Sequence, residues 1–224
     1  MFFKIFKKEK PKVTIEAIKV KEGNLDGFID ALKNKSIIVL ISGKRGSGKT
    51  ALAFALLEKI KNKRKIYMLG IKARLPRWIK QIDSVERIKN NSVVLIDEAA
   101  IAIGARESSK ALNKAISKLM AIARHKNLSL IFITQSAAML DINVLRLVDA
   151  FIIKEPSLLQ ERFERKEIKK LYEEVKQEFK KIKEGKEAYA FIFSDFFEGL
   201  IKASLPSFWN EKLSKSFAFF EVKI

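Results

Sequence analysis

A glycine-rich segment directly after an apolar run constrains this chain more than any other feature. The run Ser36-Ile-Ile-Val-Leu-Ile-Ser42 is apolar and β-branched, which predicts a buried parallel strand. It leads into Gly43-Lys-Arg-Gly-Ser-Gly-Lys-Thr50, and residues 50–61 then show helical spacing. A strand, this loop and a helix, in that order, form the G-x-x-x-x-G-K-[ST] arrangement that wraps a phosphate chain. The sequence therefore predicts a nucleotide-binding loop of the Walker A type.

Each residue type in this loop has a chemical role. Glycines let several backbone N–H groups and the helix N-terminus point at the phosphates. Lys49 places a positive charge against the β- and γ-phosphates, and the Thr50 hydroxyl ligates Mg²⁺. We expect the loop and the residue after it to line the nucleotide site: Gly43, Lys44, Arg45, Gly46, Ser47, Gly48, Lys49, Thr50 and Ala51.

A second apolar run, Val93-Val-Leu-Ile-Asp97-Glu98, ends in two carboxylates, as a Walker B motif does. We expect Asp97 to hold Mg²⁺ through its water shell and Glu98 to polarise the water that attacks the γ-phosphate. A water-activating carboxylate indicates hydrolysis, whereas a kinase excludes water from its site. The guanine-recognition pattern Asn-Lys-x-Asp does not occur, so ATP is the expected nucleotide.

Strands alternate with helices along the chain, which predicts an α/β fold with a mostly parallel sheet. Strands are expected at 13–20, 36–42, 66–70, 93–97, 128–134 and 150–154. Helices are expected at 24–35 with Asn24 as N-cap, and at 50–61, 76–81, 84–89, 107–124 and 138–147. After Pro156 we expect a long helix over 158–183 and a hairpin from 188–194 and 199–203. We therefore divide the chain into a basic N-terminal arm (1–12), an ATPase core (13–156) and a helix and hairpin appendage packed on the core (157–224).

The charge of the chain needs an acidic partner. Lys and Arg total 45 against 26 Asp and Glu, a net charge of +19. Nucleic acid, an anionic membrane surface or an acidic protein would each attract such a chain. The absence of cysteine and the single histidine, His125, exclude a disulfide framework, a thiolate zinc site and a Ser-His-Asp triad. No run is long enough to span a membrane and no secretory signal opens the chain, so we expect a cytoplasmic protein.

Four cations follow one another at i, i+4 spacing in the predicted helix after Asp97. They are Arg106, Lys110, Lys114 and Lys118, and Glu107 is the only acidic residue among them. This spacing gathers them into a stripe that could track DNA phosphates, although a solvated amphipathic face explains it as well. The basic turn 59–65 is a second candidate with the same alternative. No base-reading pattern is visible, which suits a protein that grips the backbone of any sequence.

A third apolar run completes the motif order. Ala123-Arg124 precedes it and Thr134-Gln135 closes it, and we expect Gln135 to lie beside the phosphate site. The order of phosphate loop, Asp-Glu, Ala-Arg and Thr-Gln resembles the FtsK–HerA superfamily of hexameric DNA-pumping ATPases. Within it, the chain looks most like the genome-packaging ATPases of archaeal viruses, over residues 36–155. The resemblance implies a RecA-like P-loop NTPase fold of the ASCE type.

The resemblance also implies roles and partners. Arg124 matches the arginine finger that reaches into the neighbouring subunit's nucleotide, and Gln135 matches the polar sensor. Relatives often carry glycine three residues after that arginine, where this chain has Asn127, a residue that tolerates a left-handed turn. An alternative role for Arg124 is a cation at a helix C-terminus, and Arg146 is the alternative finger. The implied assembly is a homo-oligomeric ring, a hexamer or pentamer, on double-stranded DNA, with a capsid or membrane docking partner.

Together these features favour an ATP-hydrolysing, Mg²⁺-dependent double-stranded DNA translocase. The short chain favours a viral packaging motor, in the host cytoplasm or with virions. A DNA transfer or segregation pump of a cell or plasmid is the alternative within the same class. A nucleoside or small-molecule kinase, and a non-motor ATP switch for assembly, are alternatives from other classes. DNA-stimulated hydrolysis, phosphate transfer, and ATP binding without turnover distinguish the three.

Overall fold

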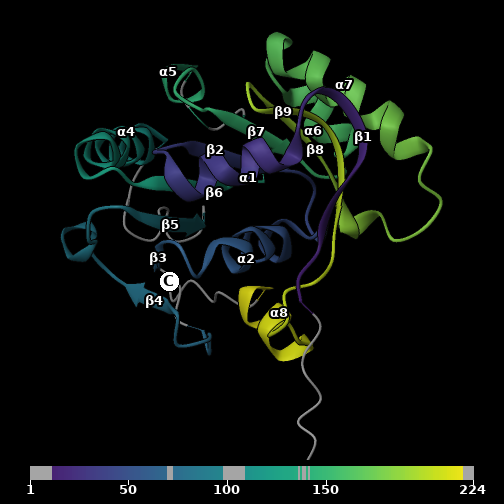
Figure 1. The fold of residues 1–224 in the computed structure, drawn as a ribbon. Coiled ribbons are helices and arrows are strands. Elements are labelled where there is room, and N and C mark those ends of the chain that lie inside the picture. The colour runs from purple at the N-terminus through teal and green to yellow at the C-terminus, as the bar shows by residue number, and fades with distance from the viewer. Residues whose placement is uncertain are drawn as a thin grey trace, which may run out of the picture.

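One nine-stranded sheet organises the part of the chain that the computed structural model describes, residues 12–69, 73–97, 109–135, 137, 140 and 142–218. The strand order is β1-β9-β8-β7-β2-β6-β5-β3-β4 (Figure 1). The strands are β1 (Ile15–Gly23), β2 (Ile38–Ser42), β3 (Lys65–Leu69), β4 (Ile79–Ile82), β5 (Ser92–Asp97), β6 (Ser129–Ile133), β7 (Ala150–Ile153), β8 (Tyr189–Ser194) and β9 (Phe197–Ala203). The helices are α1 (Leu25–Asn34), α2 (Lys49–Ile60), α4 (Ser109–Lys126), α5 (Ile142–Leu145), α6 (Leu158–Phe163), α7 (Lys166–Lys180) and α8 (Glu211–Ala218), with 3₁₀ turns η1 (Val85–Arg87) and η3 (Lys186–Ala188).

The sheet is parallel from β7 to β4. Strands β7, β2, β6, β5, β3 and β4 all pair in parallel, whereas β8, β9 and β1 are antiparallel to their neighbours. The predicted α/β fold with its C-terminal helix and hairpin is confirmed, and the hairpin strands extend the same sheet beyond β7. The first predicted strand, β1, lies at the edge of this sheet, as its alternating pattern indicates.

Helices cover both faces of the sheet, so the core has two halves. Val39 and Ile41 of β2 belong to the half beneath α1 and α2, while Ile38 and Leu40 belong to the half beneath α4 and α7. Successive side chains of a strand point to opposite faces, which is why β2 is apolar throughout. Figure 1 shows α1 and α2 lying across the near face of the sheet.

Two asparagines end helices in the way their chemistry favours. The Asn24 side chain accepts a hydrogen bond from the Gly27 N–H at 2.7 Å, so the predicted N-cap of α1 is confirmed. At the C-terminal end of α4, Asn127 adopts a left-handed φ of 51°. The Leu128 N–H then donates to the Ala123 carbonyl at 2.9 Å, which closes the helix. Asn127 therefore performs the turn that glycine makes in the family pattern.

Two predicted helices differ from the structure. Residues 76–81 and 84–89 form the edge strand β4 and the 3₁₀ turn η1 instead. Ile79 pairs with Ile66 of β3 and is buried, so sheet pairing overrides the local helical spacing. Of the predicted helix 138–147, residues 142–145 form the short α5, while residues 138, 139 and 141 lie outside the described part of the chain.

The predicted long helix 158–183 divides into α6 and α7. The chain is extended at Arg165, with φ −64° and ψ 150°. The Arg165 guanidinium donates to the Leu140 carbonyl at 2.7 Å, and Glu164 is buried. A tertiary contact therefore interrupts the helix in a segment whose charge pattern alone predicts one continuous helix. α7 buries Ile168, Tyr172, Val175 and Phe179 against the sheet.

The segment after β9 returns to the opposite face and packs on α2. The Ser207 N–H donates to the Glu58 carboxylate at 2.8 Å, and the Phe208 ring meets Phe54 edge to face, with centroids 5.5 Å apart. Among the helices in the described ranges, none combines the length and the apolar character that crossing a lipid bilayer requires.

Arg64 is buried at the amino edge of the sheet and binds several segments of the chain there. Only 8% of it is exposed, although it belongs to the basic turn 59–65 that was a candidate DNA contact. Its guanidinium donates to the carbonyl groups of Leu32, Lys35, Ser92 and Asn127 and to the Ser129 hydroxyl, over 2.6–3.3 Å. These groups lie before β2, β5 and β6 and at the end of α4. Arg64 thus has a structural role, whereas Lys59, Lys63 and Lys65 in the same turn are exposed.

Replacing Arg64 tests this role. Arg64→Met would leave several buried carbonyl groups without a donor, so we expect it to lower the free energy of unfolding by about 3 kcal/mol or more. Arg64→Lys should recover little of this loss, because one ammonium group cannot reproduce the guanidinium fork. The exposed Lys63→Met is the matched control and should change stability by less than about 0.5 kcal/mol. Urea unfolding measures all three, and equal stability of Arg64→Met and Lys63→Met would contradict the assignment.

Candidate nucleotide site

The carboxyl edge of the parallel strands gathers most of the predicted site residues. Ile133 of β6 pairs with Ile41 of β2 on one side and with Asp97 of β5 on the other. Thr134 and Gln135 follow β6, so they lie between the loop after β2 and the end of β5. Ligands of open α/β sheets bind at this edge. The structure therefore brings the loop 43–50, Asp97 and Gln135 into one region.

The phosphate loop is fixed by close backbone packing. Gly46 and Gly48 have φ values of 76° and 85°, in the left-handed region that favours glycine. A Cβ on Gly48 would lie 2.7 Å from the Glu187 carbonyl oxygen, so no side chain fits there. The Lys44 N–H donates to the Glu155 carbonyl at 3.0 Å. The Leu52 N–H donates to the Gly48 carbonyl at 3.0 Å, and this hydrogen bond begins α2. The first turn of α2 thus directs its N–H groups toward the loop.

The side chains of the loop suit a bound phosphate chain. The Lys49 ammonium lies inside the loop, 2.7 Å from the Gly43 carbonyl oxygen and 2.9 Å from that of Lys44. The Ser47 hydroxyl is buried and has no hydrogen-bond partner within the described part of the chain. Around Gly46, a Cβ would meet nothing within 4 Å, so the tip of the loop is open. A buried cation, a buried hydroxyl and an open tip fit an anionic ligand.

The residues expected to hold Mg²⁺ offer suitable donors. Thr50 lies half-buried in the first turn of α2, and Asp97 lies half-buried at the end of β5. A hydroxyl and a carboxylate oxygen are ligands that Mg²⁺ prefers. Glu98, the predicted base, lies outside the described residues.

Lys154 is a site residue that the sequence analysis missed. It follows β7 and is 1% exposed, and its Nζ donates to the Glu187 carbonyl at 2.6 Å. A Cβ on Gly43 would lie 2.6 Å from the Lys154 Cβ, so this lysine forms the wall behind the loop. The pKa of Lys154 is lowered to about 7, chiefly by burial, while the charge of Glu187 opposes this shift and that of Lys49 adds to it. A polar residue closing an apolar parallel strand was the available signal.

A hydrogen bond to α7 fixes the base of the loop from the other face. The Ser42 hydroxyl and the Tyr172 hydroxyl lie 2.7 Å apart, and both side chains are buried. Ser42 is the last residue of β2, directly before Gly43. Burial raises the pKa of Tyr172, so its hydroxyl stays protonated and remains available as a donor. The predicted long helix thus contributes, through α7, to positioning the loop.

The remaining predicted residues lie away from the loop. Lys118 is exposed on α4, whose backbone also carries Lys110 and Lys114, while Arg106 lies outside the described residues. Arg124 is exposed in the last turn of α4, and Arg146 is exposed after α5. Both arginines precede parallel strands, so they lie toward the amino edge of the sheet. Neither arginine therefore joins the loop within its own chain.

Comparisons with known proteins support a nucleotide-binding fold. A family model described as Novel STAND NTPase 3 matches residues 20–145. No protein of curated function matches the chain by sequence. The matched range contains the loop 43–50, Asp97 and Gln135, and it ends before Lys154.

Two solved structures share the fold. The genome packaging NTPase B204 from Sulfolobus turreted icosahedral virus 2, in complex with ATP-γ-S, has a TM-score of 0.50 and 18% identity, over 77% of this chain and 98% of the viral one. The pCW3 conjugation coupling protein TcpA, in its monomer form with ATP-γ-S, has a TM-score of 0.53 and 14% identity, over 94% of this chain and 71% of TcpA. One of them is named a genome packaging NTPase, so the resemblance drawn from the motif order is confirmed at the level of the fold.

The buried amine of Lys154 predicts a specific pH dependence. Its pKa is about 7 in the folded chain and 10.5 ordinarily, so between these values the unfolded chain binds a proton that the folded chain lacks. The free energy of unfolding should therefore rise with pH over this window, by up to about 1.4 kcal/mol per pH unit. Lys154→Met should lack this contribution, as urea unfolding at pH 7, 8 and 9 would reveal. The exposed Lys183→Met is the control, and a Lys154→Met profile parallel to wild type would refute the effect.

Proposed function

The chain belongs to the Novel STAND NTPase 3 family, and from this premise we propose that it is an ATP-hydrolysing motor that moves double-stranded DNA. The observation that carries the proposal is the meeting of the loop 43–50, Asp97 and Gln135 at one edge of the sheet. The relatives of similar fold are named for genome packaging and for conjugation, the two settings in which we place this motor.

The residues of the site divide the work of hydrolysis. Lys49 and the N–H groups of the loop stabilise the negative charge that develops on the phosphates. Thr50 and Asp97 would hold Mg²⁺, which would offset the negative charge of the phosphates when it is bound. Glu98 accepts the proton of the attacking water, and the Gln135 amide orients that water. This division supports hydrolysis over transfer to a second substrate.

We assign Arg124 to the nucleotide of a neighbouring subunit in a ring. The loop lies at the carboxyl edge of the sheet, while Arg124 lies at the end of α4, before β6. An arginine on the opposite edge can act on this chemistry only in another subunit's site. Its exposure, in a turn closed by Asn127, leaves the guanidinium accessible to such a neighbour. Arg146 remains the alternative for the same role.

DNA is the partner that best accounts for the positive charge. The net charge of +19 favours a polyanion, and the sequence of α4 contains Lys110, Lys114 and Lys118 at i, i+4 spacing. Contacts of this kind bind phosphates without reading bases, as a translocase requires. Lys118 is exposed, and α4 follows the strand that ends at Asp97, so this surface is linked in sequence to the site of hydrolysis.

Steady-state ATP hydrolysis with and without double-stranded DNA tests the function. We expect DNA to stimulate hydrolysis, and the stimulation to fall as salt rises, because phosphate contacts release counterions.

Glu98→Gln should bind ATP but lower turnover by about a hundred-fold or more, since it removes the general base. Lys49→Ala should abolish ATP binding. Phosphate transfer to a small molecule would support a kinase instead, and tight binding without turnover an assembly switch.

The surface that contacts DNA can be located by measuring DNA affinity at several salt concentrations. The triple variant Lys110→Ala, Lys114→Ala, Lys118→Ala should reduce the slope of log affinity against log salt by about three. The triple variant Lys59→Ala, Lys63→Ala, Lys65→Ala removes the same charge from the exposed part of the basic turn. If the second variant, and not the first, changes the slope, the DNA contact lies on the turn.

Mixed rings test the action of Arg124 in trans. Arg124→Ala and Lys49→Ala subunits should each be inactive alone, because each lacks one half of every interface. Random co-assembly should restore both groups at about a quarter of the interfaces, so the mixture should regain measurable ATP hydrolysis. Pairing Arg146→Ala with Lys49→Ala tests the alternative finger. A mixture that is no more active than its components would exclude Arg124 from the neighbouring site.

A further inference from the structure

A cavity of about 410 Å³ adjoins the phosphate loop on the side away from β5. Ala51 and Leu52, in the first turn of α2, form one wall, and Lys154 lies at the base. Ala188, Ser204 and Leu205, from the C-terminal part of the chain, are among the residues that complete it. Thus the cavity lies between the helix that follows the loop and the hairpin strands at the end of the chain.

Close contacts make this cavity continuous with the phosphate loop. Lys154 contacts Gly43 from behind, and the Glu187 carbonyl approaches Gly48 so closely that a Cβ there would lie 2.7 Å away. Both Lys154 and Glu187 also line the cavity, and Ala51 directly follows Thr50. A phosphate chain held by residues 43–50 would therefore have one end beside this cavity.

The walls match the chemistry of a nucleoside. Ala51, Leu52, Ala188 and Leu205 present methyl and methylene groups, which pack against the face of an aromatic base. The Ser204 hydroxyl adds a polar group at the edge, suited to sugar hydroxyls. Ligand pockets range from about 300 to 1,000 Å³, and in this cavity the apolar groups are joined by charged side chains, among them Glu16, Lys154 and Lys202.

We propose that this cavity holds the ribose and base of the nucleotide whose phosphates bind at residues 43–50. The inference rests on the proposed function and extends it to nucleoside recognition. All of the lining residues except Ala51 and Leu52 lie outside the family-matched range 20–145. The phosphate site thus belongs to the family core, whereas the two ends of this chain supply the nucleoside site.

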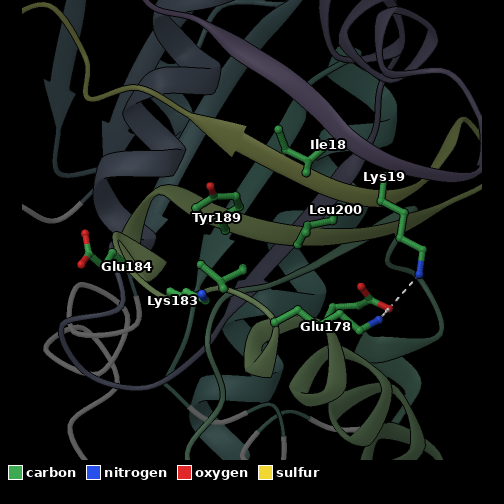
Figure 2. A pocket seen from close by; sticks show the side chains of 9 residues that line it. Ile18, Lys19, Glu178, Lys183, Glu184, Tyr189 and Leu200 are labelled. Carbon is green, nitrogen blue, oxygen red and sulfur yellow. Dashed lines mark hydrogen bonds and ion pairs between the residues drawn. The ribbon is translucent and has the colours of Figure 1, made fainter.

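A larger cavity beside the same hairpin provides a control. It measures about 630 Å³ and lies between β1, β9 and the end of α7 (Figure 2). Ile18 and Lys19 line it, and Lys19 forms an ion pair with Glu178 at 2.8 Å. None of its lining residues belongs to the phosphate loop or to α2. Bulk added here tests for general disturbance of the hairpin.

Two ligands distinguish the contribution of the nucleoside to binding from that of the phosphates. Titration calorimetry with ATP and with inorganic tripolyphosphate, each with Mg²⁺, measures both affinities. Ala188→Trp fills the proposed cavity and should weaken ATP at least ten-fold while it leaves tripolyphosphate binding unchanged. Ile18→Trp adds the same ring to the larger cavity and should change neither affinity. Lys49→Ala should abolish binding of both ligands.

The outcomes distinguish this inference from the function on which it rests. Wild-type ATP affinity in a folded Ala188→Trp would overturn the nucleoside site and leave the phosphate loop in place. Retained ATP binding in Lys49→Ala would overturn the nucleotide assignment itself. If Ala188→Trp does not fold, Leu205→Trp decides in the same way, because Leu205 is 60% exposed at the rim and tolerates bulk.

Discussion

The absence of room for side chains at Gly43 and Gly48 is the constraint on which the site depends. Lys154 and the Glu187 carbonyl press against these two positions, at distances that only glycine permits. The Lys154 N–H donates to the Ser42 carbonyl at 2.8 Å, and the Lys44 N–H donates to the Glu155 carbonyl. A flexible glycine loop is thus shaped by strand β7 and by the turn before β8. Its preorganisation for phosphate comes from segments more than a hundred residues away in the sequence.

The sequence predicted the parts of the fold that local pattern determines. Apolar runs located β2, β5, β6 and β7, and the loop motif located the start of α2, because a strand buried on both faces must be apolar throughout. Asn24 and Asn127 were predicted from their side-chain chemistry to suit helix ends. In the structure, Asn24 caps the N-terminus of α1 and Asn127 forms the turn after α4. Motif spacing then placed Asp97 and Gln135 on strands that meet the loop.

The parts that sequence analysis missed are set by contacts distant in sequence. Ile79 lies in a strand because Ile66 pairs with it, and α6 ends because Arg165 binds the Leu140 carbonyl. Lys154 and Arg64 look like surface cations in the sequence, yet both are buried by elements that the chain forms elsewhere. Charge predicts exposure only when no backbone carbonyl competes with water for the cation.

The same contacts redistribute the positive charge of the molecule. Arg64 binds backbone carbonyl groups at the amino edge of the sheet and Lys154 packs behind the loop, so neither belongs to an exposed cationic surface. Along α7, acidic side chains pair with β1 across the sheet edge, with Lys19 on Glu178 and Lys21 on Glu174, each at 2.8 Å. Part of the positive charge at that end of the sheet is therefore paired with carboxylates. A polyanion would accordingly be attracted toward the opposite part of the molecule, where the lysines of α4 and of the turn after α2 lie, rather than toward the hairpin that closes the nucleoside cavity.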